Sequence, residues 1–173
     1  MTTHYDTMPS PVGELLLGAA DDGVTCIRFD REGEGHLPAD GWRRADGGRA
    51  SLVLADARAQ LEAYFAGELT GFDLPLAARG TAFQERVWSA LRGIAFGEAI
   101  SYAELARRIG EAKSVRAVGH ANGRNPLPVI VPCHRVIGAD GSLTGFGGGI
   151  QRKRWLLEHE GALQGTATLR LPL

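Results

Sequence analysis

Residues 97–126, GEAISYAELARRIGEAKSVRAVGHANGRNP, contain two short helical patterns in succession. Ser101 is placed to cap the first helix and Gly110 to end it, and Ser114 is placed to cap the second. The apolar positions that keep a helical period are Leu105, Ala106 and Ile109, followed by Val115, Val118 and Ala121. Two helices joined by a short turn are typical of a helix-turn-helix unit.

The same segment is basic and has few large side chains. Its cationic residues are Arg107, Arg108, Lys113, Arg116 and Arg124. Such a cluster indicates binding to phosphate groups, although a solvated basic face would have the same sequence. The second helix carries the small residues Ala117, Gly119, Ala121 and Gly123, although a glycine inside a helix costs up to ~1 kcal/mol relative to alanine. We therefore expect this helix to approach a neighbouring element or a narrow groove closely.

Charge divides the chain of 173 residues near residue 78. Residues 1–78 hold six Arg, no Lys and 13 acids, a net charge of −7, whereas residues 79–173 hold 13 basic residues and seven acids, a net charge of +6. The total of −1 would by itself argue against nucleic acid as a partner. The asymmetry instead predicts an acidic domain over residues 1–78 and a basic domain over residues 79–173.

The first part has the pattern of a small α/β unit. Two apolar runs, 15–17 and 24–29, flank the turn sequence DDG at 21–23, which predicts a β-hairpin. Residues 31–50 read as a loop. A helix is expected from a cap at Ser51 to an end at Gly67, and FDLPL at 72–76 reads as an edge strand because it contains Pro75.

Neither cysteine has a partner in the sequence. Cys26 and Cys133 form no CxxC pair and no zinc-like spacing, so no disulfide scaffold, no metal site and no cofactor are expected. His4, His36 and Cys26 lie apart from one another, and we expect structural roles for them. The chain shows no signal peptide and no apolar run long enough to span a membrane, which predicts a cytoplasmic protein without membrane contact.

Beyond residue 79, Thr81 can cap a helix. The apolar face of that helix would consist of Phe83, Val87, Ala90 and Leu91, with Trp88 beside it.

Residues 125–149, NPLPVIVPCHRVIGADGSLTGFGGG, carry the candidate chemistry. The stretch is stiffened by three prolines, Pro126, Pro128 and Pro132. They forbid a helix and favour an extended apolar run that ends at Cys133. A buried cysteine is usually an inert small hydrophobe, but His134 and Arg135 follow this one at once, as is typical of an activated nucleophile. Because adjacent side chains point in different directions, we expect His134 to reach the thiol through a water molecule.

These motifs resemble the O6-alkylguanine-DNA alkyltransferase family, also called methylated-DNA–protein-cysteine methyltransferases. The similarity runs through most of residues 80–161, in GTAFQERVW, SYAELA, RAVGHANGRNP, VPCHRVIG, LTGFGGG and RKRWLLEHEG, and more loosely through SPVGEL and AYFAGEL. The resemblance implies an α/β (α+β) fold: a small N-terminal ribonuclease-H-like α/β domain, then a mostly helical, winged-helix-like C-terminal domain with the helix-turn-helix. It also implies DNA repair by direct damage reversal, in which one alkyl group moves irreversibly from O6-alkylguanine, or from O4-alkylthymine, to Cys133 after base flipping.

Five residues match the catalytic positions of the family. By this resemblance Cys133 is the acceptor thiol, His134 takes the thiol proton through water, and Glu160 holds the imidazole. Tyr102 hydrogen-bonds the guanine and helps to neutralise it as it leaves, and Asn125 braces the turn around the active site.

The resemblance also places the second helix in the minor groove of DNA, which fits its small side chains. Arg116 would enter the base stack in place of the flipped nucleotide, and the backbone of Cys133, Val136 and Gly147 would read the base edge. The further expected contacts are Ser114, Ala117, Ala121, Arg124, Arg135, Phe146 and Gly148. The implied partner is double-stranded DNA with O6-alkylguanine, bound by a monomer that could assemble cooperatively on the duplex.

Some positions depart from the family pattern. Ala95 and Phe96 stand where Pro-Tyr is usual, and Phe146 stands where Tyr is common, which bears on the alkyl groups accepted. The basic run 151–154 reads as the exposed start of the helix that carries Glu160. Residues 162–173 read as either a tail or a strand.

Three other functions stay open on the residues alone. They are a binder of alkylated DNA that transfers nothing, a helix-turn-helix regulator, and a thiol hydrolase or redox enzyme. The presence of Cys133 argues against the first, and the sequence has no dimerisation element to support the second. A single alkyl adduct on Cys133, with no further turnover, would separate the transferase from all three.

Overall fold

The computed structural model describes residues 2–30 and 38–163. The chain divides into two compact units, Met1–Arg79 and Gly80–Leu173. The boundary lies within two residues of the point at which the charge changes sign.

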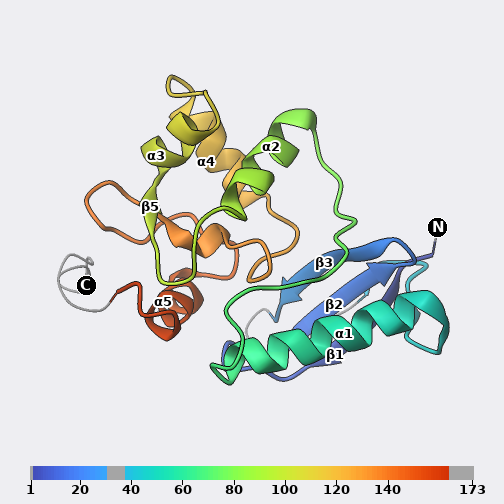
Figure 1. Ribbon diagram of the computed structural model, residues 1–173. Coiled ribbons are helices and arrows are strands. Elements are labelled where there is room, and N and C mark those ends of the chain that lie inside the picture. Colours follow the sequence, from blue (N-terminus) through green and yellow to red (C-terminus); the bar gives the residue numbers. More distant parts are fainter. Residues whose placement is uncertain (1, 31–37, 164–173) are drawn as a thin grey trace. The chain divides into compact units, whose positions relative to one another are not determined.

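The first unit is a four-stranded sheet with one long helix. Its elements are β1 (His4–Met8), β2 (Leu15–Ala20), β3 (Gly23–Phe29), β4 (Arg43–Arg44) and α1 (Gly48–Phe65). The strand order is β3-β2-β1-β4, with antiparallel pairing except between β1 and β4. Figure 1 shows α1 lying across one face of this sheet. Every residue of β2 is buried, because β2 is a central strand and α1 packs against it.

The hairpin predicted over residues 15–29 is confirmed, and the two other local predictions need correction. The helix begins at Gly48, one turn before Ser51, whose hydroxyl bonds to the backbone of Gly47 instead of capping a helix that starts there. The expected loop 31–50 therefore includes β4 and the first residues of α1, and residues 31–37 lie outside the described residues. The FDLPL segment forms no strand, and only Leu76 makes an isolated parallel bridge to Val24.

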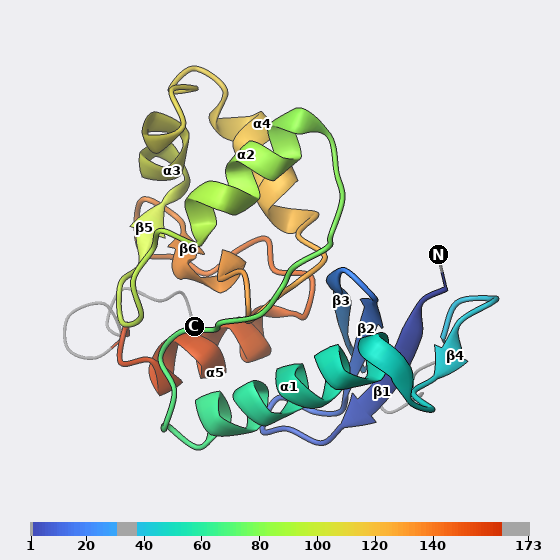
Figure 2. The same cartoon turned by 45° about the vertical axis from the view of Figure 1, so that its right-hand side comes forward.

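The second unit is mostly helical. Its elements are α2 (Ala82–Leu91), β5 (Ile100–Ser101), α3 (Tyr102–Arg108), α4 (Val115–Gly123), the 3-10 turn η1 (Cys133–Arg135), β6 (Val136–Ile137) and α5 (Ile150–His159). Figure 2 shows α2 and α4 side by side, with β5 and β6 paired beneath them. That short parallel pair joins the start of α3 to the segment that follows the Cys133 turn. Leu163 is buried against Leu143 and Leu157, and residues 164–173 lie outside the described part.

Local signals explain the ends of these helices. Thr81 and Gln84 form a reciprocal capping box at α2, and the Ser101 hydroxyl accepts from the Glu104 N–H at α3, as expected. Gly110 follows α3 with a φ of +75°, a left-handed conformation that favours glycine. Ser114 precedes α4 as predicted, but its side chain makes no capping hydrogen bond.

The core of the helical cluster differs from the predicted one at Trp88. Its ring is buried, whereas Phe83 and Ala90 are only half-buried. The Trp88 indole N–H donates to the Ala121 carbonyl at 2.9 Å, so α2 is tied to α4 through a buried bond.

Candidate functional site

The turn that presents Cys133 is built from a fully buried run, residues 127–136. Asn125 bridges the start of this run: its amide N–H donates to the Val131 carbonyl at 2.8 Å, and its oxygen accepts from the Leu127 N–H at 3.0 Å. Val129 has a φ of +73°, a conformation that costs a non-glycine residue on the order of 1–3 kcal/mol. These two hydrogen bonds give a geometric basis for the predicted bracing role of Asn125. The strained residue, Val129, lies inside the turn that Asn125 closes.

Cys133 itself is buried, with 5% of its surface exposed. Burial raises the pKa of the thiol, while the Asn125 side chain and the charge of Lys153 act to lower it. The resting side chain is therefore a protonated thiol, and a nucleophilic reaction needs a base to take its proton.

His134 and Glu160 provide a buried base and its orienting group. The imidazole Nε2 lies 2.9 Å from Glu160 Oε2, and both side chains are buried. Because a carboxylate can only accept a hydrogen bond, Nε2 donates and Nδ1 carries the free lone pair. Nδ1 is buried with no hydrogen-bond partner in the described part of the chain. Burial lowers the pKa of His134, and this keeps the ring neutral.

Arg135 belongs to the same cluster. Its guanidinium donates to both oxygens of Glu160, at 2.8 Å and 3.0 Å, and to the Ile94 carbonyl. Only 6% of the residue is exposed. The prediction that Arg135 contacts DNA is therefore wrong, because its donors are occupied inside the fold.

A buried lysine interacts electrostatically with the thiol. Lys153 is fully buried, its Nζ donates to the Thr144 carbonyl at 2.7 Å, and it lies 5.8 Å from the centre of the Tyr102 ring. The Tyr102 hydroxyl donates to the same carbonyl at 3.0 Å. Burial lowers the pKa of Lys153 to about 8, and the charge of Cys133 acts against this. The expectation that residues 151–154 form an exposed helix start is wrong at Lys153, which points inward.

The buried amide of Asn122 is a further group that sequence reasoning missed. Its side chain is 1% exposed and its amide N–H lies 3.5 Å from the Cys133 carbonyl, while its oxygen has no hydrogen-bond partner in the described part of the chain. In the sequence, only the position of Asn122 three residues before Asn125 pointed to a role for this amide.

The candidate DNA-binding residues divide into exposed and buried groups. Arg116, Ala117, Arg124 and Gly147 are exposed, and Ser114, Phe146 and Gly148 are half-buried. Ala121 is buried, so a contact from its side chain to DNA is excluded; Val136 is also buried, and its expected contact through the backbone stays a prediction. The Val136 N–H bonds to the Cys133 carbonyl.

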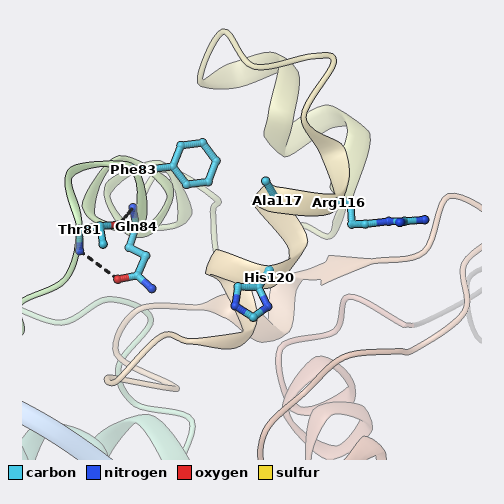
Figure 3. A pocket seen from close by; sticks show the side chains of 6 residues that line it. All are labelled: Thr81, Phe83, Gln84, Arg116, Ala117 and His120. Carbon is cyan, nitrogen blue, oxygen red and sulfur yellow. Dashed lines mark hydrogen bonds between the residues drawn. The ribbon is translucent and has the colours of Figure 1, made fainter.

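The basic footprint is smaller than the sequence indicates. Arg107 forms two hydrogen bonds to Glu104, and Arg108 contacts Glu104 and Glu98. These acids offset the two cations on α3. A separate surface hollow lies between the start of α2 and α4, lined by Thr81, Phe83, Gln84, Arg116, Ala117 and His120. Figure 3 shows Phe83 and His120 on either side of it, whereas Arg116 extends away from Phe83.

The small residues of α4 have different causes. A Cβ on Gly119 would lie 3.4 Å from the Tyr102 ring, whereas one on Gly123 would meet nothing within 4 Å. Ala117 is exposed and Ala121 is buried. Only Ala117 and Gly123 therefore leave the outer surface of the helix free of large side chains.

His4 and Cys26, for which the sequence predicts structural roles, lie in the described part of the first unit. His4 Nε2 lies 3.7 Å from Asp46, and Cys26 is a half-buried free thiol whose pKa is raised by burial. His36 lies outside the described residues. Over residues 2–30 and 38–163, no cluster of three His, Cys, Asp or Glu side chains could hold a metal ion. In the same part of the chain, no helix combines the length and apolarity that a membrane crossing requires.

Comparison with known proteins gives matches over both units. The family model described as 6-O-methylguanine DNA methyltransferase, ribonuclease-like domain, matches residues 3–78, and the model for the DNA binding domain of the same enzyme matches residues 82–162. A methylated-DNA–protein-cysteine methyltransferase of Mycobacterium tuberculosis is 52% identical over 157 residues, which cover 91% of this chain and 92% of that protein. One from Methanosarcina acetivorans is 45% identical over 159 residues, covering 92% and 99%.

Solved structures agree with these matches. The crystal structure of M. tuberculosis O6-methylguanine methyltransferase has a TM-score of 0.81 at 49% identity, covering 97% of this chain and 99% of that one. The structure of M. tuberculosis OGT in complex with DNA has a TM-score of 0.81 at 48% identity, covering 96% and 98%. The α/β fold with a helical C-terminal domain is thus confirmed. With both halves matched and the identity near one half over nine-tenths of its length, the chain belongs to the 6-O-methylguanine DNA methyltransferase family.

Proposed function

We propose that this protein repairs alkylated DNA by direct reversal, with Cys133 as the acceptor of one alkyl group from O6 of guanine. The observation that carries the proposal is the buried sequence of Cys133, His134 and Glu160 in a chain of this methyltransferase family. The residue that follows the thiol in the chain is a neutral imidazole whose free nitrogen can accept a proton. This arrangement suits a single nucleophilic displacement.

In the proposed reaction Sγ of Cys133 attacks the alkyl carbon in line with its bond to O6. A carbon–sulfur bond forms as the carbon–oxygen bond breaks, and the electron pair leaves with the guanine. The thiol proton passes through water to Nδ1 of His134, while the guanine anion takes up a proton and leaves as the repaired base. Because the product is a thioether on Cys133, the thiol is consumed and each molecule acts once.

Positioning and leaving-group stabilisation supply most of the acceleration in this proposal. Complete ionisation of a thiol with a pKa of ~8.5 would raise its reactive fraction at neutral pH by at most roughly thirtyfold. Holding sulfur and carbon in line contributes more, as do donors aimed at the departing base. The hydroxyl of Tyr102 and the ammonium of Lys153 converge on the Thr144 carbonyl, and we assign them this task.

The minor groove is the proposed binding surface for the duplex. Arg116, Ala117, Gly123 and Arg124 are exposed on or just after α4 and leave a cationic surface without large side chains, which suits a narrow groove. Phosphate contacts of this kind position the protein on any sequence, as a search for damage requires. In this proposal Arg116 occupies the space of the flipped nucleotide, the loop at 146–148 contacts the base, and the protein acts as a monomer.

The test is mass spectrometry after incubation with an excess of O6-methylguanine duplex. We expect the chain to gain the mass of one methylene group, located on the peptide that contains Cys133, and the reaction to stop at one equivalent. Cys26→Ala is the matched control because it removes the other thiol, and it should react normally. Cys133→Ala should form no adduct yet bind the duplex.

Other results would contradict the proposal. Continued turnover would indicate a hydrolase or redox enzyme, and binding without an adduct on the wild-type chain would indicate a non-catalytic DNA-binding protein. A parallel reaction with O4-methylthymine duplex determines whether that base is also a substrate.

A further inference from the structure

The acid-base pair of the site has a third, buried member that the proposed reaction does not use. Arg135 directs Nε and Nη2 at the two oxygens of Glu160 and Nη1 at the Ile94 carbonyl. Its guanidinium carbon also lies 5.9 Å from the centre of the Phe96 ring. With 6% of the residue exposed, Arg135 has no opportunity to exchange these partners for a phosphate.

Glu160 is consequently shared between two donors. Oε1 accepts from Arg135 Nε, and Oε2 accepts from both Arg135 Nη2 and His134 Nε2. An isolated buried carboxylate is costly, and it must find a counter-charge or take up a proton. In this cluster the permanent cation is Arg135, since a guanidinium stays protonated in proteins. The carboxylate and guanidinium therefore balance each other, and the imidazole can remain neutral.

We propose that Arg135 is a positioning residue that acts through Glu160: it balances the carboxylate charge, so that His134 stays neutral and its Nδ1 remains free to accept the Cys133 proton. This inference rests on the proposed function, because it assigns a purpose to the free nitrogen. It differs from a purely structural salt bridge in one respect, namely that the protonation state of His134 depends on it.

The other groups around His134 support this assignment. Burial lowers its pKa most strongly, Glu160 raises it, and Arg135 and Lys153 lower it. Removing Arg135 takes away one lowering influence and leaves Glu160 to attract a proton to the pair. Taken up by the ring, that proton occupies Nδ1, because Nε2 already carries the hydrogen that it shares with Glu160. The base is then blocked.

The first measurement is an NMR titration of the His134 ring in protein without DNA. In Arg135→Met we expect the midpoint to rise by about one pH unit or more, which corresponds to about tenfold more protonated ring at a given pH. The matched control is Arg58→Met, which removes an arginine that pairs with Glu62 in the first unit, and it should leave the His134 titration unchanged. An unchanged midpoint in Arg135→Met would overturn the inference.

The second measurement is the single-turnover transfer rate at saturating O6-methylguanine duplex, followed against pH. Arg135→Met should be about tenfold slower at acidic pH, below the wild-type His134 midpoint, and should recover at higher pH, because the acid limb of the profile moves with His134. A merely structural role predicts an equal loss at every pH, and that result would refute the proposal. The NMR titration needs no substrate, so a failure of the proposed DNA reaction would be seen separately as a missing adduct.

Two further variants keep the test decisive if Arg135→Met folds poorly. The double variant Arg135→Met/Glu160→Gln removes both charges together, which buried pairs tolerate better than the loss of one partner. Its His134 midpoint should stay close to that of the wild type, because the charges balance again. Arg135→Lys retains the cation and should also keep the wild-type midpoint. A midpoint raised as in Arg135→Met in either variant would contradict charge balance as the cause.

Discussion

Replacing Lys153 with methionine should change how stability depends on pH by an amount that the structure determines. The pKa of Lys153 is lowered from 10.5 to about 8, chiefly by burial. A shift of this size corresponds to about 3 kcal/mol at ~1.4 kcal/mol per pH unit. Since the folded pKa lies below the unfolded one, this group adds its full stability only above the unfolded pKa of 10.5. That stability, about 3 kcal/mol in total, is lost as the pH falls from 10.5 to about 8.

The assay is urea denaturation of the wild-type protein and Lys153→Met at several pH values between about 7 and 10. The wild-type free energy of unfolding should rise relative to the variant along this series, by up to about 3 kcal/mol. Lys113→Met is the matched control because Lys113 is exposed, and its difference from the wild type should stay constant. A difference between Lys153→Met and the wild type that does not change with pH would refute the assignment of a buried, charged lysine.

The same variant should transfer alkyl groups more slowly, although it can be the more stable protein at neutral pH. Lys153 lowers the pKa of Cys133 by its charge and holds the Thr144 carbonyl that Tyr102 also uses. A charge kept in the interior at a cost to stability is a common property of functional sites. A Lys153→Met protein with the wild-type single-turnover rate would contradict this role.

Three other changes have defined outcomes. Tyr102→Phe should slow single-turnover transfer by about 100-fold while duplex affinity is unchanged, since only a hydrogen-bond donor is lost; weaker binding in a gel-shift titration would place the hydroxyl at the DNA interface instead. Arg124→Gln should lower duplex affinity and reduce the slope of its salt dependence by about one. Arg107→Gln should change the affinity and the salt slope less, because Glu104 already pairs with Arg107. Equal effects of the two substitutions would disprove this difference between Arg124 and Arg107. Trp88→Phe should lower the free energy of unfolding by about 1–3 kcal/mol in urea, because the buried Ala121 carbonyl loses its donor; an unchanged value would mean that water replaces the indole.

Features that depend on neighbours in the chain could be read from the sequence. The hairpin at 15–29, the caps at Thr81 and Ser101 and the end of α3 at Gly110 all depend on hydrogen bonds or backbone angles within a few residues. The candidate nucleophile followed from similarly local information, because prolines, Cys133 and His134 are adjacent. The wrong helix start at Ser51 also has a local cause. Its hydroxyl bonds to the backbone of Gly47, and a serine in that position resembles a helix cap in the sequence.

The partners of charged side chains were decided by the tertiary structure. Arg135 meets Glu160 across 25 residues of sequence, and Lys153 meets Thr144 across the loop before α5. In the sequence both residues look like exposed cations suited to phosphate, and Ala121 looks like one more small residue facing a groove. Burial depends on which elements pack together. A cation taken out of water needs a partner, and the fold decides which carboxylate or carbonyl lies within its reach. The sequence alone thus determined which residue can react, whereas the packing of α5 against the Cys133 turn determined which charges control it.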